Sequence, residues 1–126
     1  MNFIKRFAIS TIMLLVPLAS YSEVDPVPAF CLAGWIPACS GYSYIYGEQT
    51  NYRLSGDHVH IDGDSFRISG DHIYGNNDSY RISGDHIYGN NDSYRISGDY
   101  IYADNSSYRI SGNHIFGDNE DFRLSY

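Results

Sequence analysis

YRISGDHIYGNNDS, residues 80–93, is one of five consecutive 14-residue repeats in this chain. Residues 66–79 differ from it only in their first residue, Phe66. Looser copies begin at Tyr52, Tyr94 and Tyr108, and half copies open and close the array at residues 45–47 and 122–126. A fixed short period indicates units that bury apolar side chains against their neighbours rather than each within itself.

The centre of each copy predicts a β-hairpin. Residues 83–86, Ser-Gly-Asp-His, place glycine at the first central position of a two-residue turn, and a type II′ turn needs positive φ there. Such a turn sets Arg81 opposite Tyr88 and Ile82 opposite Ile87. Because side chains alternate along a strand, each hairpin is expected to have one aliphatic face and one face of Arg, His and Tyr.

The linkers and the half copies predict how the hairpins are joined. The Asn- and Asp-rich residues 76–79 and 90–93 are typical of tight turns into the next hairpin. Residues 45–46 and 122–125 together would complete a sixth hairpin and close the sheet, which removes its exposed edges. The sequence therefore predicts an all-β fold of tandem 14-residue hairpin repeats closed into a small barrel or flower-like ring. The alternatives are an open β-meander or a solenoid.

The phrase at residues 67–75, Arg-Ile-Ser-Gly-Asp-His-Ile-Tyr-Gly, and its neighbours resemble the five-fold form of the bacterial β-flower hairpin-repeat family. The resemblance covers roughly residues 41–126. It implies a shallow barrel of hairpin petals without a settled activity, and it brings no catalytic residues to this chain. The count of six hairpins departs from five-fold symmetry, and the Asn-rich linkers also differ from the family pattern.

The first 22 residues predict export. Lys5 and Arg6 precede an apolar run over residues 7–19, and small residues at 19–22 suit cleavage after Ser22, which is typical of a secretory signal peptide. The alternative is an uncleaved membrane anchor, although the run is shorter than the roughly 20 residues that a spanning helix needs. We expect a periplasmic or extracellular protein.

The predicted mature chain is small and acidic. Removal of residues 1–22 from the 126 leaves 104, in which six arginines stand against 15 acidic residues for a formal charge of −9. Such a chain is a poor match for nucleic acid. An anionic membrane would repel the molecule as a whole, although a local patch could still bind.

Residues 23–40 differ from the repeats. They hold three of the four prolines, the one tryptophan and both cysteines, Cys31 and Cys39. An even cysteine count in an exported protein predicts a disulfide. We expect the segment to be a cap or plug at one end of the array, because repeat arrays need their ends covered. The alternative is an apolar tip, Phe30 to Ile36, that touches membrane or a partner.

The recurring Ser83, Asp85 and His86 do not predict an enzyme. Strand alternation would point Asp85 and His86 apart or into the turn, so we expect Asp85 not to orient the imidazole as a catalytic triad requires. No nucleophile elbow is present. We predict no catalytic residues and no cofactor.

Metal binding is a weaker alternative. Four histidines occupy the same place in successive copies, and they could hold zinc or copper if their face of the ring pointed inward. These are His58, His72, His86 and His114. The Gly-Asn-Asn-Asp turn at residues 89–92 resembles calcium-binding repeats, but the period of fourteen differs from nine.

The systematic pairing of arginine with tyrosine favours a binding surface. Each pair could pack within the sheet or present a multivalent surface to sugars or lipid head groups. The predicted ligand-facing residues are Arg67, Arg81, Arg95, Arg109, His72, His86, Tyr74, Tyr88 and Tyr102. We therefore predict a secreted, non-enzymatic binding or cell-envelope module, with a self-assembling matrix protein as the alternative.

Overall fold

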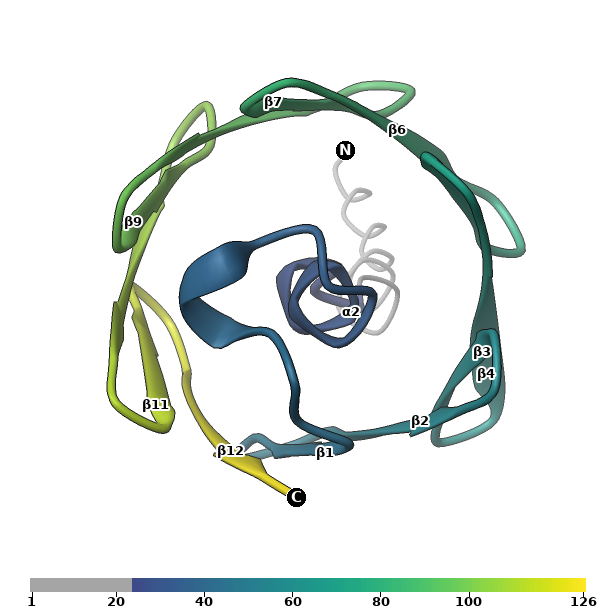
Figure 1. Cartoon of the computed structure of the whole chain (residues 1–126), viewed down its shortest axis with the longest axis horizontal. Coiled ribbons are helices and arrows are strands. Elements are labelled where there is room, and N and C mark those ends of the chain that lie inside the picture. Colours follow the sequence, from purple (N-terminus) through teal and green to yellow (C-terminus); the bar gives the residue numbers. More distant parts are fainter. Residues whose placement is uncertain (1–23) are drawn as a thin grey trace, which may run out of the picture.

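The computed structural model describes residues 24–126 as one closed β-barrel around a short central segment (Figure 1). Twelve antiparallel strands follow one another around the barrel, and β1 pairs with β12 to close it. The all-β fold and the closed ring are thus confirmed. The predicted signal peptide lies outside the described residues.

Each repeat contributes a longer first strand and a shorter second strand. The strands are β1 (Tyr44–Tyr46), β2 (Asn51–Ser55), β3 (His58–Ile61), β4 (Asp64–Ser69), β5 (His72–Tyr74), β6 (Ser79–Ser83), β7 (His86–Tyr88), β8 (Ser93–Ser97), β9 (Tyr100–Tyr102), β10 (Ser107–Ser111), β11 (His114–Gly117) and β12 (Asp121–Ser125).

The register within and between hairpins is the one that the repeat predicts. In the β6–β7 hairpin, Arg81 lies opposite Tyr88 and Ile82 opposite Ile87. At the closure, Ile45 lies opposite Leu124, so the two half copies do form the sixth hairpin. The aliphatic face points into the barrel, where Ile45 and Ile87 are fully buried.

Two kinds of turn lie at opposite ends of the barrel. At one end, which we call the turn end, Gly84 has a φ of 65°, as the two-residue turn requires. At the other, the linker end, the Gly89 amide donates to the Asp92 carbonyl oxygen at 2.7 Å. The Tyr80 ring lies directly over Gly89, where a Cβ atom would stand 2.8 Å from the ring. This close approach explains glycine at that position of the repeat.

The segment before the barrel fills its lumen. A barrel of eight strands is just wide enough to be filled by its own side chains, so one of twelve needs additional filling. The filling comes from α2 (Val27–Leu32) and the 3₁₀ turn η2 (Pro37–Cys39), which lie inside the ring in Figure 1. We call residues 24–40 the plug. The segment was expected to be a cap or plug at one end of the array; of the two it is a plug, and it lies inside the barrel rather than over one end.

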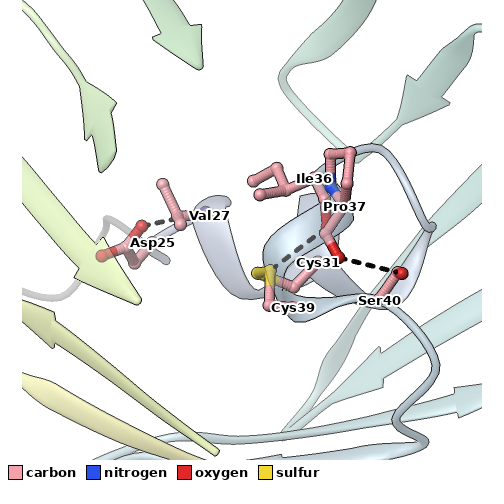
Figure 2. Close-up of a disulfide and its surroundings, with 7 residues drawn as sticks. All are labelled: Asp25, Val27, Cys31, Ile36, Pro37, Cys39 and Ser40. Atoms are coloured by element: carbon pink, nitrogen blue, oxygen red, sulfur yellow. Dashed lines mark hydrogen bonds between the residues drawn. A yellow bond between two sulfur atoms is a disulfide. The ribbon is translucent and has the colours of Figure 1, made fainter. Parts of the chain in front are cut away.

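Aromatic packing and a disulfide hold the plug. The fully buried Phe30 ring meets the rings of Tyr80 and Tyr94 edge-on, at centroid distances of 5.1 and 5.2 Å. Cys31 and Cys39 form the predicted disulfide, with Cα atoms 5.3 Å apart. Figure 2 shows this bond within the ring of strands, with Asp25 before α2. Within residues 24–126, no helix is long and apolar enough to cross a membrane.

Candidate functional site

The polar face of every hairpin points outward and together these faces encircle the barrel. We call this surface the outer belt. On each first strand it has an exposed arginine, and on each second strand a pair of rings two residues apart. The members are Arg53, Arg67, Arg81, Arg95, Arg109 and Arg123, with the ring pairs Tyr44 and Tyr46, His58 and His60, His72 and Tyr74, His86 and Tyr88, Tyr100 and Tyr102, and His114 and Phe116.

The two rings of each pair stack nearly parallel. The ring centroids of His86 and Tyr88 lie 6.0 Å apart with an interplanar angle of 11°, and those of His72 and Tyr74 lie 5.7 Å apart at 4°. Residues i and i+2 of a strand share one face, which is why two aromatic residues at this spacing stack. The rings remain accessible, since Tyr88 is 44% exposed.

Arginine side chains lie over these rings. The guanidinium carbon of Arg81 is 5.2 Å from the centroid of Tyr88, and that of Arg95 is 4.8 Å from Tyr102. On its other side Arg81 lies opposite His72 of the preceding hairpin. Each contact is a cation–π interaction worth about 0.5–1 kcal/mol at an exposed site. The belt therefore alternates cation and ring, hairpin after hairpin.

The belt also crosses the seam where the barrel closes. The guanidinium carbon of Arg123 lies 4.9 Å from the ring centroid of Tyr46, although the two residues are far apart in the chain. In the β10–β11 hairpin, the guanidinium carbon of Arg109 lies 5.0 Å from the ring centroid of Phe116. A phenyl ring thus replaces the usual tyrosine in this copy. Arg123, Tyr46 and Phe116 were not among the predicted ligand-facing residues, but both contacts repeat the Arg–ring pattern of the other copies.

Three of the five histidines of the belt contact the carboxylate of the preceding residue. His86 Nδ1 lies 2.9 Å from Asp85 Oδ1, and the same contact joins His58 to Asp57 at 2.8 Å and His72 to Asp71 at 2.9 Å. The expectation that Asp85 would not orient His86 is therefore wrong. Asp85 is a turn residue, so strand alternation does not govern its direction. An ionised carboxylate only accepts hydrogen bonds, so Nδ1 is the donor in this contact.

The four repeated histidines, His58, His72, His86 and His114, lie on the outer face and belong to separate hairpins. The inward-facing arrangement that metal binding would need is absent from this part of the chain. Within residues 24–126, no three His, Cys, Asp or Glu side chains gather closely enough to hold a metal ion. The pairing of Asp with His thus orients single rings and does not build a ligand cluster.

The linker end of the barrel has a polar cavity of about 530 Å³ whose walls include linker residues and Asp25. Asp25 Oδ1 accepts from the Val27 amide at 3.0 Å, and Oδ2 accepts from the Tyr108 hydroxyl at 2.8 Å. Burial raises the pKa of Asp25 above its ordinary value, although both hydrogen bonds lower it. Burial also raises the pKa of the Tyr52 and Tyr108 hydroxyls, with the Asp25 charge as the second cause. These groups anchor the start of the plug.

The structure brings the predicted ligand-facing residues together on one surface and separates them from the apolar plug residues. Phe30 and Ile36 are fully buried in the lumen, so contact between them and a membrane would require the plug to leave the barrel. The stacking of the ring pairs was missed by the sequence analysis, although the i and i+2 spacing on a single strand contained the signal.

A comparison of the chain with protein-family models, curated proteins and solved structures finds no match. The resemblance to the β-flower family stays a prediction.

Proposed function

We propose that this protein is a secreted, non-enzymatic binding module of the cell envelope or its surroundings, and that the outer belt is its ligand-binding surface. The observation that supports this is the repeated contact of an exposed arginine with an exposed ring, as in Arg67 over Tyr74 at 4.9 Å. Exposed tyrosine and histidine rings offer flat faces to sugars or lipid head groups, and guanidinium groups offer hydrogen-bond donors.

The proposal also rests on where the apolar groups lie. The plug and the aliphatic faces of the hairpins fill the lumen, where Phe30, Ile73 and Ile101 are fully buried. A repeated surface multiplies one weak site, and several weak sites acting together raise the apparent affinity for a repetitive ligand by avidity. Strand pairing around the whole barrel leaves no open sheet edge among residues 41–126, so edge-to-edge self-assembly gains no support.

Binding to glycan and lipid arrays tests the proposal. The variant Arg67→Ala/Arg81→Ala/Arg95→Ala removes three neighbouring guanidinium groups from the belt and is expected to lose the binding seen with the unmodified mature protein. The control variant Asn77→Ala/Asn91→Ala/Asn105→Ala changes exposed linker residues at the end of the barrel and is expected to bind normally. Equal binding by both variants would rule out the belt as the binding surface.

A further inference from the structure

All the cations within residues 24–126 that are charged regardless of pH lie on the outer belt, and their charges are uncompensated. The ion-pair contacts in this part of the chain are the three between Asp and His, so none joins an arginine to a carboxylate. Among residues 24–126, no acceptor takes a hydrogen bond from these guanidinium groups either. Each arginine therefore has its full set of N–H donors available to a ligand.

The stacking holds these donors in place. The guanidinium carbons of five of the six belt arginines, all but Arg53, lie 4.8 to 5.2 Å from a ring centroid, so the distance varies by only 0.4 Å among these five copies. A guanidinium group over a ring face can keep the N–H groups of its edge free, and this edge matches the two oxygens of a carboxylate, sulfate or phosphate group. Less rotational freedom remains to be lost when an anion binds.

The carboxylates lie mainly toward the two ends of the barrel. Those of Asp57, Asp71 and Asp85 lie in the hairpin turns at one end, where they contact the belt histidines that follow them, and those of Asp78 and Asp92 lie in the linkers at the other end. Although the predicted mature chain has a net charge of −9, all its arginines are gathered on the outer belt, and none forms an ion pair with a carboxylate of residues 24–126. The poor match to nucleic acid was predicted from the net charge alone, which does not report where the arginines lie.

We infer that the outer belt recognises an acidic polysaccharide, by a guanidinium group on each carboxylate or sulfate and by ring faces on the sugars between them. This inference rests on the proposed function. Successive arginines are two strands apart, which is about 10 Å along the belt, so a polymer with regularly spaced oxyanions can meet several of them. A lipid bilayer is flat, whereas the wall of the barrel is curved all around (Figure 1), so a bilayer could contact only part of the belt at once.

One position of the outer belt differs in charge between the repeats. Opposite the second ring of each pair, the neighbouring first strand has a serine in most copies, such as Ser79 opposite Tyr74 and Ser93 opposite Tyr88. At the same place β12 has Asp121, opposite Phe116. Asp121 adds a negative charge to the belt near Arg123, so this segment is expected to bind an anion more weakly than the segments around Arg81 and Arg95.

The test compares two polymers with the same backbone. The mature protein is titrated with carboxymethyl-dextran of low substitution and with unmodified dextran, at about 50 mM and 200 mM salt, by isothermal titration calorimetry. Tighter binding of the carboxymethyl polymer, weakening as salt rises, is expected. Arg67→Gln/Arg81→Gln/Arg95→Gln should lower its affinity at least tenfold, and Arg67→Lys/Arg81→Lys/Arg95→Lys should lower it severalfold although the charge is kept. Asp121→Ser should raise the affinity for carboxymethyl-dextran.

Each contrary outcome has a distinct meaning. If both dextrans bind equally and the glutamine variant loses both, the belt binds glycans but the acidic polymer is the wrong ligand. If the glutamine variant binds as the unmodified protein does, the belt is not the site and the proposed function fails as well. If vesicles containing phosphatidylglycerol bind and carboxymethyl-dextran does not, the partner is a membrane and the polysaccharide inference is overturned. If the lysine variant binds as tightly as the unmodified protein, the stacked guanidinium geometry is refuted.

Discussion

Truncation of Phe30 to alanine tests whether the plug is the centre of the hydrophobic core. The side chain is fully buried, stacks on Trp35 at 5.7 Å and meets two wall tyrosines edge-on. Removal of a buried phenylalanine costs about 3–5 kcal/mol, and more when the surroundings cannot collapse into the space. A closed wall of twelve hydrogen-bonded strands cannot easily move inward, so we expect the upper half of that range.

Urea unfolding of the mature protein, followed by near-ultraviolet circular dichroism, measures the effect. A loss of this size in a domain of about 100 residues corresponds to a fall in melting temperature of roughly 15 °C or more. If Phe30→Ala does not fold, Phe30→Leu keeps most of the volume and should cost less than about 1.5 kcal/mol. The control Tyr88→Ala removes an outer ring that is 44% exposed, and it should cost about 1 kcal/mol or less. Equal losses in Phe30→Ala and Tyr88→Ala would refute the placement of the plug in the lumen.

Three further changes probe single features. The double variant Cys31→Ser/Cys39→Ser opens a short disulfide loop and should lower the free energy of unfolding by about 2–3 kcal/mol; dithiothreitol should destabilise the unmodified protein and leave the variant unchanged. Because burial raises the pKa of Asp25 in the folded state, its contribution to stability is complete below its unfolded pKa of about 4 and is lost as the pH rises through the folded value. Asp25→Asn should therefore flatten the dependence of unfolding free energy on pH above that value, and an unchanged slope would contradict the burial. Gly84→Ala should cost about 1–2 kcal/mol because φ is 65°, while a Cβ atom there would meet nothing within 4 Å; the exposed neighbour Ser83→Ala should change stability by less than about 0.5 kcal/mol.

The hairpins and their closure could be predicted because the determining interactions are local and repeated. The Gly84–Asp85 turn fixes which residues face each other, and alternation then sorts Ile82 and Ile87 to the inside. Closure followed from the half copies, and the pairing of Ile45 with Leu124 confirms it. These inferences needed no knowledge of contacts between distant parts of the chain, apart from that seam.

The plug could not be predicted in the same way. Its helix has only six residues, starts after Pro26 and contains Pro28, so neither length nor apolar periodicity marks it. A helix this short is stable only through packing, and the packing partners, Tyr80 and Tyr94, come from repeats far along the chain. The direction of Asp85 was missed for a related reason, since turn residues do not follow strand alternation.

The inner face of the sheet stabilises the fold, whereas the outer face is available for binding. Inward residues such as Tyr80 and Ile87 are fixed by packing against the plug and their neighbours, so changes there act on stability. Outward residues such as Arg81 and Tyr88 contribute little to the fold. Even so, the repeats at residues 66–79 and 80–93 have identical residues at all their outward positions. Equivalent sites joined in one rigid ring bind a repetitive ligand by avidity, so loss of one arginine should weaken binding modestly and loss of three neighbouring ones disproportionately. Such non-additivity would distinguish a belt that acts as a unit from five independent Arg–ring contacts.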